Sequence, residues 1–218
     1  MRILFVVQES GVRPSGVVTV VMQLCKEWDK NDHFPKDVFK KLANLGVTSL
    51  TVPKEYGGNG KDMMATIATI EELCTRSLGV ASGYIFCACY AGLNIAEVAS
   101  EEQKQELLPK VAKGELLFSY GISEPDVGAD VASVKTRAVI EEEEVVINGS
   151  KRWCSGPQVT DFIYTIVRSG PEEERYKNLS IILIPPNLPG ITIEPQSTLG
   201  QKGVGGTCDV TFDNVKVP

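Results

Sequence analysis

The hydrophobic pattern of this 218-residue chain changes its period near residue 120, and that change limits the folds open to it. Before this point, apolar residues recur at helical spacing in segments such as Lys36–Leu45 and Met63–Leu78. After it, short segments alternate between apolar and polar residues, as strands do. The boundary is Tyr120–Asp130, a polar stretch with too many turn formers to continue a helix or a strand. The pattern therefore predicts an α+β protein with helices first and strands second.

Three parts are predicted along the chain: an atypical strand, loop and helix over residues 1–26, an α-helical bundle over residues 27–118, and an antiparallel β-barrel or sandwich over residues 119–218. In the first part, the strand is expected at Ile3–Val7 and the helix at Val17–Trp28. Within the bundle, Val80–Ala99 carries only one charged residue, so we expect this helix to be buried nearly all round. Length and hydrophobic content are sufficient for a sizeable core.

Local signals also predict how individual elements begin and turn. Ser100 and Gln103 have the spacing of a capping box, and Pro109 is expected to interrupt the helix that follows. Asn148-Gly149 predicts a tight hairpin turn. The four acidic residues Glu141–Glu144 are expected to form a solvated hairpin end, because no other ligand types surround them to make a cation site.

Composition excludes several classes of function. The net charge of −6 argues against nucleic acid or an anionic membrane surface as the main partner. None of the six cysteines forms a Cys-x-x-Cys pair and there is a single histidine, so no metal site is predicted and the cysteines are expected to be reduced packing residues. The apolar opening, residues 1–7, is too short for a signal segment or a membrane span. These features predict a soluble cytoplasmic protein.

Two polar segments are the candidate functional site. Tyr120–Asp130 is followed, one short hairpin later, by Lys151–Pro157. Both contain residues that bend the backbone and leave N–H groups free to act as donors, which can bind a ligand without side-chain entropy. We therefore expect the two segments together to form the face of a cofactor site.

The residues of these segments resemble a known family. Ser123-Glu-Pro-Asp-Val-Gly-Ala-Asp130 is similar to the Thr/Ser-Glu-Pro-x-x-Gly-Ser-Asp loop of the flavin-dependent acyl-CoA dehydrogenases, and Asn148-Gly-Ser-Lys-Arg-Trp-Cys-Ser155 is similar to their Asn-Gly-x-Lys-x-Trp segment. Further matches to the family occur, in the same order, at Phe34-Pro35, Leu45-Gly46, Val52-Pro-Lys-Glu-Tyr-Gly-Gly58, Glu101-Glu-Gln-Lys104, Pro189-Gly190-Ile191 and Phe212-Asp-Asn-Val-Lys-Val-Pro218. The resemblance covers about residues 27–218.

The resemblance implies that the β-domain holds FAD, with Trp153 flanking the flavin ring and the Ser155 hydroxyl near its reactive N5 edge. Hydride transfer to N5 needs fixed donors and a dry, shaped face. The full set of expected cofactor-binding residues is Tyr120, Gly121, Ile122, Ser123, Gly128, Trp153, Cys154 and Ser155. Taken singly, Ser123 and Ser155 could instead be hydroxyls that cap turns, and Trp153 could be barrel core.

The resemblance also implies where an acyl-CoA substrate would bind. Ala129 stands where the family usually has a serine that helps to hold the ligand, and the lost hydrogen bond should weaken binding by about 1 kcal/mol. Tyr84 and Tyr90 could line an acyl pocket, but an interior helix would carry the same residues, so both readings stay open. Glu124 matches a structural residue of the family, and nothing nearby in the sequence would raise its pKa.

Two departures from the family pattern bear on activity. Residues 1–26 do not resemble the family's first helix, although Val17–Trp28 could substitute for it. The family's fold continues into a C-terminal helical bundle that supplies the catalytic base, and this sequence stops at Pro218, where that bundle would begin. We therefore assign no catalytic residue, and we expect a further helical segment, a separate helical chain or an oligomer to complete the site.

The function implied by the resemblance is oxidation of an acyl-CoA to the 2,3-enoyl-CoA in fatty acid metabolism, with electrons passing from FAD to an electron-transfer flavoprotein. Two alternatives stay open. One is a non-catalytic split or degenerate member of the family that binds a separate helical chain. The other is a different flavin reaction on the same scaffold, such as that of an oxidase or a monooxygenase.

Overall fold

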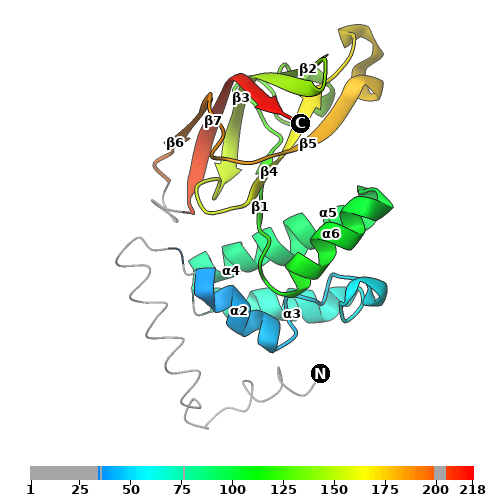
Figure 1. Cartoon of the computed structure of the whole chain (residues 1–218). Coiled ribbons are helices and arrows are strands. Elements are labelled where there is room, and N and C mark those ends of the chain that lie inside the picture. Colours follow the sequence, from blue (N-terminus) through cyan, green and yellow to red (C-terminus); the bar gives the residue numbers. More distant parts are fainter. Residues whose placement is uncertain (1–33, 35, 76, 199–204) are drawn as a thin grey trace. The chain divides into compact units, whose positions relative to one another are not determined.

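The computed structural model describes residues 34, 36–75, 77–198 and 205–218. They belong to two compact units, one helical and one of β-strands, which divide between Leu117 and Phe118 (Figure 1). This division lies one residue before the predicted boundary between the α-helical and β-domains. The strand predicted at Ile3–Val7 and the helix predicted at Val17–Trp28 lie outside the described residues.

In the helical unit, the side chains of Asp62, Ser77 and Ser100 each cap the start of a helix by accepting a backbone hydrogen bond. The elements of this unit are α2 (Lys36–Asn44), η2 (Lys54–Tyr56), α3 (Met63–Cys74), α4 (Leu78–Tyr84), the π-helical η3 (Ile85–Leu93), α5 (Asn94–Val98) and α6 (Glu101–Ala112). The predicted capping box at the start of α6 is confirmed, since the Gln103 N–H donates to Ser100 Oγ at 3.2 Å and the Ser100 N–H donates to Gln103 Oε1 at 3.0 Å. The interruption expected at Pro109 is wrong, because α6 runs through this residue. Burial of Leu107, Leu108 and Val111 offsets the one hydrogen bond that proline removes.

The helix formed by α4, η3 and α5 is the core of the helical unit. Residues Val80, Ala81, Tyr84, Phe86, Cys87, Ala88, Ala91 and Ile95 are all buried, as the nearly uncharged sequence predicts. Helix packing here is close, because a Cβ on Gly83 would lie 2.4 Å from Phe39 Cζ. By length and composition Leu78–Val98 could also cross a membrane, but more than half of its most apolar window is buried inside the unit, which favours a core helix.

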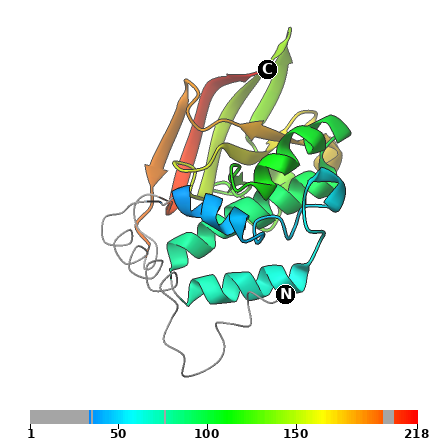
Figure 2. The ribbon, with the colours of Figure 1, turned by 60° about the horizontal axis from the view of Figure 1, so that its bottom comes forward.

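The second unit is a curled, mixed sheet, and with the helical unit it confirms the α+β class (Figure 2). Its strands are β1 (Phe118–Gly121), β2 (Arg137–Glu141), β3 (Glu144–Ser155), β4 (Phe162–Arg168), β5 (Leu179–Ile184), β6 (Ile191–Pro195) and β7 (Thr207–Val217), and η4 (Val131–Ser133) and η5 (Glu172–Asn178) lie between strands. The strand order is β1-β4-β2-β3-β7-β6, with β5 on β4. Its core contains Ile147, Cys154, Ile163, Val167, Ile184, Val210, Phe212 and Val215.

The prediction of a purely antiparallel sheet needs correction. β1 pairs with β4 in parallel, and β2 meets β4 in parallel at Arg137 and Arg168. The other pairings, β2–β3, β3–β7, β4–β5 and β6–β7, are antiparallel. Long connections separate β1 from β4 and allow a parallel pairing. Alternation of apolar and polar residues identifies a strand but carries no information on the direction of its neighbour.

The hairpin turn falls at the acidic residues and not at Asn148-Gly149. Glu141, the last residue of β2, pairs with Glu144, the first residue of β3, which confirms the predicted hairpin end. The turn predicted at Asn148-Gly149 is wrong, because both residues lie within β3, at an irregularity in its pairing with β7. There the Asn148 side chain accepts a hydrogen bond from the Asn214 N–H at 2.8 Å. The positive φ of glycine can serve a bulge as well as a turn.

Candidate functional site

The structure brings the two polar segments together at the end of β1. The Arg152 N–H in β3 donates a hydrogen bond to the Ser123 carbonyl oxygen at 2.8 Å. From the preceding residue, Lys151 Nζ donates to the Ile122 carbonyl oxygen at 3.2 Å. Residues that follow β1 are therefore held against the part of β3 that carries the second segment, as the sequence predicts for one shared face.

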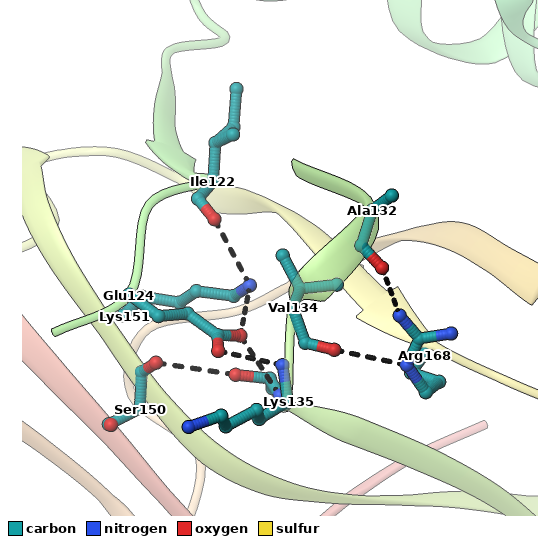
Figure 3. Close-up of polar contacts among 9 residues, drawn as sticks. Ile122, Glu124, Ala132, Val134, Lys135, Ser150, Lys151 and Arg168 are labelled. Carbon is teal, nitrogen blue, oxygen red and sulfur yellow. Dashed lines mark hydrogen bonds and ion pairs between the residues drawn. The ribbon is translucent and has the colours of Figure 1, made fainter. Parts of the chain in front are cut away.

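A buried ion pair lies beneath this junction (Figure 3). Lys151 Nζ and Glu124 Oε1 are 2.9 Å apart, and the two side chains are 0% and 5% exposed. Glu124 also accepts hydrogen bonds from the backbone N–H groups of Lys135, at 2.7 Å, and Thr136, at 2.9 Å. The ion pair thus connects three segments of the chain: the loop after β1, the segment before β2, and β3.

The surroundings keep Glu124 ionised. Burial by itself would raise the pKa of this carboxyl, but the hydrogen bonds from Lys151 and from two backbone N–H groups outweigh burial and lower the pKa overall. Burial lowers the pKa of Lys151, and the attraction of Glu124 opposes that effect. A general acid or base with an accessible proton would need the opposite environment, so Glu124 acts as a structural carboxylate, as expected from the sequence.

Arg168 fixes the same segment from its other side. Its Nε donates to the Val134 carbonyl oxygen at 3.1 Å, and its Nη2 donates to the Ala132 carbonyl oxygen (Figure 3). The side chain is buried, and among the described residues its Nη1 has no hydrogen-bond partner. Residues 132–136 therefore have carbonyl groups bound by Arg168 and N–H groups bound by Glu124, which leaves this part of the backbone little freedom.

These roles of Lys151 and Arg168 were not predicted from the sequence. For Lys151, the available signal was its position on the same face of β3 as buried Ile147. Arg168 alternates with Ile163 and Val167 and lies on the other face of β4, so those apolar residues gave no such signal for it. A lysine or arginine at such a position is seldom buried unless it is paired. The alternation of apolar and polar residues could not identify the partners of Lys151 and Arg168, because these partners are distant in sequence.

Trp153 is exposed and is held in an unusual backbone conformation. It lies in the irregular stretch of β3 between the pairs Lys151–Val210 and Cys154–Cys208, and its φ is +63°. A bulky residue with positive φ is uncommon and costs free energy. The ring is 59% exposed, so the alternative that Trp153 is barrel core is wrong.

Arg152 supports Trp153 from one side. Its guanidinium lies 5.7 Å from the centroid of the indole ring. The same guanidinium is fixed by Asp209, with Nε and Nη2 at 3.1 and 2.9 Å from Oδ2. The indole therefore has one cationic neighbour of defined position, while most of its surface is open.

Polar groups near these residues are free to bind a ligand. Ser123 and Ser155 are half-buried, and neither hydroxyl makes a hydrogen bond to any described residue. The alternative that they cap turns is therefore not what the structure shows. The Ser123 N–H is also without a partner among the described residues. Cys154, between Trp153 and Ser155, is fully buried, and burial raises the pKa of its thiol to about 12, so only its backbone could take part in a site.

The remaining residues predicted on the β-unit differ in their surroundings. The Tyr120 ring lies 5.4 Å from that of Tyr164, and a Cβ on Gly121 would be 3.0 Å from atoms of Ile163 and Thr165, so β1 packs closely on β4. Gly128 and Ala129 are exposed, just beyond the bridge between Glu124 and Val127. A Cβ on Gly128 would meet no atom within 4 Å, so the protein itself does not require glycine there.

The predicted substrate residues Tyr84 and Tyr90 belong to the helical unit. The Tyr84 side chain is fully buried and its hydroxyl donates to the Val47 carbonyl oxygen at 2.9 Å, which favours the packing alternative. The Tyr90 ring is half-buried and lies 5.7 Å from that of Phe86. Within the described parts of the chain, no three His, Cys, Asp or Glu side chains are placed to share a metal ion.

Comparisons with known proteins match both units to one family. A family model for the acyl-CoA dehydrogenase N-terminal domain matches residues 17–115, and a model for the acyl-CoA dehydrogenase middle domain matches residues 119–215. The match to the first model begins at residue 17, the first residue of the segment Val17–Trp28 that could substitute for the family's first helix. Nearly all of the chain is thus covered by these two models.

Individual relatives agree with the family models. An acyl-CoA dehydrogenase of Bacillus subtilis is 32% identical over 193 residues, which are 87% of this chain and 50% of the relative. A glutaryl-coenzyme A dehydrogenase in complex with glutaryl-CoA has a TM-score of 0.78 at 27% identity, covering 95% of this chain and 56% of that one. The ChsE4–ChsE5 complex from Mycobacterium tuberculosis has a TM-score of 0.76 at 28% identity, and the match covers 91% of this chain and 50% of that one. The chain spans about half the length of the curated relatives it matches.

Proposed function

Because this chain belongs to the acyl-CoA dehydrogenase family, we propose that its β-unit binds FAD and serves the α,β-dehydrogenation of an acyl-CoA to the 2,3-enoyl-CoA. The proposed flavin site consists of Tyr120–Ser123 and Trp153–Ser155. Gly128 is included because it belongs to the same loop and leaves open space around its backbone.

The observation that carries this proposal is Trp153. An indole that is 59% exposed, in a backbone conformation with φ of +63°, is disfavoured twice, by its contact with water and by its backbone energy. Such a residue is explained if its exposed face packs against a flat apolar group. The isoalloxazine ring of FAD is such a group, and aromatic rings gain from stacking beyond the area that they bury.

The donors around Trp153 also fit a flavin. The ring of FAD carries carbonyl and nitrogen acceptors along its edge, and the free donors here are the Ser123 N–H and the hydroxyls of Ser123 and Ser155. When bound, FAD would supply the hydride acceptor of the reaction. The residues of this chain would orient the ring, exclude water from its face and hold fixed donors toward its edge.

The acyl-CoA substrate, the catalytic base and the electron acceptor are parts of the same proposal. Ala129 offers no side-chain donor, and we expect substrate binding to be weaker by about 1 kcal/mol than in relatives with serine there. The base is assigned to no residue of this chain, since the family resemblance places it in a C-terminal helical bundle. A helical partner or segment, oligomer formation, and transfer of electrons to an electron-transfer flavoprotein follow from the same resemblance.

Two observations support association with a partner and a reducing compartment. Met64 is 78% exposed and Ile67 47% exposed in α3, so this helix presents apolar side chains that a partner could cover. The five described cysteines form no disulfides and three of them are buried, which is consistent with the cytoplasmic location that we propose. A role in fatty acid metabolism is a further part of the proposal. The match to a two-protein family complex is consistent with assembly from more than one chain.

The proposal can be tested by recording the flavin spectrum of the purified chain, alone and with a co-expressed helical partner. We expect bound FAD, and anaerobic bleaching by acyl-CoA when the partner is present. Flavin without bleaching under either condition would favour the non-catalytic alternative, and bleaching coupled to oxygen consumption would favour an oxidase. Absence of flavin under both conditions would contradict the proposal.

Site variants connect that experiment to the structure. Trp153→Ala should lower flavin retention in a folded protein. A matched control is Tyr176→Ala, which removes another aromatic ring of the β-unit that is 64% exposed and lies 5.7 Å from an arginine guanidinium. Equal retention in the two variants would show that the indole ring does not contact the flavin.

A further inference from the structure

The Ile122–Ser123 peptide group is bound on one side only. Its carbonyl oxygen accepts a hydrogen bond from Lys151 Nζ at 3.2 Å. Its N–H, which belongs to Ser123, has no partner among the described residues. The described chain contains no cis peptide bond, so the C=O and the N–H of this peptide point in opposite directions. With the carbonyl directed at buried Lys151, the N–H is directed away from it.

The contact of Lys151 with this peptide is charge-assisted and shielded from water. Lys151 Nζ has 0% side-chain exposure and lies 2.9 Å from Glu124 Oε1. A cation on the carbonyl oxygen polarises the peptide group and makes its N–H a stronger donor. Because water is excluded from Nζ, this polarisation is weakened less than it would be at the surface.

Stability alone does not explain an ion pair at this position. Burying two charges has a desolvation cost that can exceed their attraction, and apolar residues of similar size often serve the fold equally well. Here both charged groups also bind backbone: Lys151 binds the Ile122 carbonyl, and Glu124 binds the N–H groups of Lys135 and Thr136. Glu124 thereby fixes the position of Nζ, and Nζ fixes the orientation of one peptide group.

We propose that Lys151 is a positioning residue for the flavin, which orients the Ile122–Ser123 peptide and polarises its N–H as a donor to the ring. This inference rests on the proposed FAD site and adds to it a residue that would not touch the cofactor. Glu124 is a second positioning residue, because its carboxylate holds Lys151 Nζ next to the Ile122 carbonyl oxygen.

The proposal predicts the sign of an effect on flavin reduction. Hydride transfer adds negative charge to the ring, so a polarised N–H stabilises the reduced flavin more than the oxidised flavin. Loss of Lys151 should therefore weaken binding of both forms and weaken binding of the reduced form more. A tenfold larger loss for the reduced form corresponds to a midpoint potential lower by about 30 mV for a two-electron couple.

The test compares the affinity for FAD and the flavin midpoint potential of the full chain and three variants. Lys151→Met removes the cation. Because this change leaves Glu124 buried without its partner and can prevent folding, a double variant with Glu124→Gln and Lys151→Gln replaces the ion pair by neutral hydrogen-bonding groups. Lys216→Met is the matched control, since Lys216 forms an exposed ion pair with Glu144 at 2.8 Å on the same unit.

We expect the Kd for FAD to rise at least about tenfold and the potential to fall by about 30 mV in whichever Lys151 variant folds, with both values unchanged in Lys216→Met. Unchanged affinity and potential in a folded Lys151 variant would overturn the proposal. Weaker binding with an unchanged potential would also overturn it, because a purely structural role has that result. If the unaltered chain binds no FAD, the proposed function itself fails, whereas the other outcomes leave that function standing.

Discussion

The conformation of Trp153 makes a prediction that reverses the usual order of alanine and glycine in a strand. In an ordinary strand, a protein with glycine at a given position is less stable than one with alanine there by about 0.5–1 kcal/mol, because glycine gives the unfolded chain more conformational freedom. At a left-handed position, a residue with a Cβ has a conformational cost of about 1–2 kcal/mol that glycine avoids. Trp153 has a φ of +63°, so Trp153→Gly should be more stable than Trp153→Ala by about 0.5–1 kcal/mol.

The loss of the indole itself affects both variants. Complete burial of a large aromatic side chain contributes about 3–5 kcal/mol, and Trp153 is 59% exposed, so Trp153→Ala should lose only about 1–2 kcal/mol. Part of that loss is the contact with the Arg152 guanidinium, 5.7 Å from the ring centroid. Trp153→Gly should recover part of the loss through relief of the backbone strain.

Urea denaturation of the three proteins measures these differences directly as free energies of unfolding. Flavin retention supplies a second, independent value, since both variants lack the ring and should retain equally little FAD. Lower stability of Trp153→Gly than of Trp153→Ala would contradict this prediction, because that is the order expected for a regular strand. It would then follow that the strained backbone is not present in solution.

Three further predictions concern the support of the site. Burial alone would raise the pKa of Glu124, but hydrogen bonds lower it overall, so the contribution of Glu124 to stability should be present above the unfolded pKa of about 4.3 and lost as pH falls through the lower folded value. The unfolding free energy should therefore fall more steeply in acid for the unaltered chain than for Glu124→Gln. At pH 7, Glu124→Gln should be less stable than the unaltered chain by about 3–5 kcal/mol. Gly149→Ala should destabilise the chain by about 1–3 kcal/mol, because the φ of residue 149 is +142° and the new Cβ would lie 2.6 Å from a backbone atom. Gly128→Ala should leave the unfolding midpoint in urea nearly unchanged, since its Cβ would have no atom within 4 Å. Equal midpoints for the two variants would contradict this prediction. In thiol labelling followed by mass spectrometry, exposed Cys74 should react rapidly and Cys154 slowly, because burial raises the pKa of the Cys154 thiol to about 12. Rapid labelling of Cys154 in the native protein would show that this part of β3 opens.

The order of elements was predictable because it depends on local patterns. The capping box at Ser100 and the acidic hairpin end at Glu141–Glu144 were confirmed because each is decided by a few adjacent residues. The turn expected at Asn148-Gly149 was wrong for the opposite reason. A contact with Asn214, distant in sequence, fixes that dipeptide at an irregularity in the pairing of β3 with β7, and local turn propensity cannot include such a contact.

The candidate site was predictable in its location but not in its construction. The polar segments that contain Tyr120 and Trp153 stand out in the sequence, and the structure brings them together; that they bind a flavin is implied by the family and stays a proposal. That Trp153 would have positive φ, or that Lys151 would be fully buried against Glu124, could not be seen in advance. Both depend on how β1 and the irregular part of β3 meet, which is a tertiary property.

We propose that the residues after β1 and the irregular part of β3 form one flavin-binding face. Hydrogen–deuterium exchange of the full chain, with and without saturating FAD, tests it most directly because it reports on individual backbone segments. If FAD binds there, exchange should be slower in peptides covering residues 120–123 and 152–155 and unchanged in the reference strand β6, Ile191–Pro195. Unchanged exchange in the first two segments, in a chain that binds FAD, would mean that the flavin binds elsewhere.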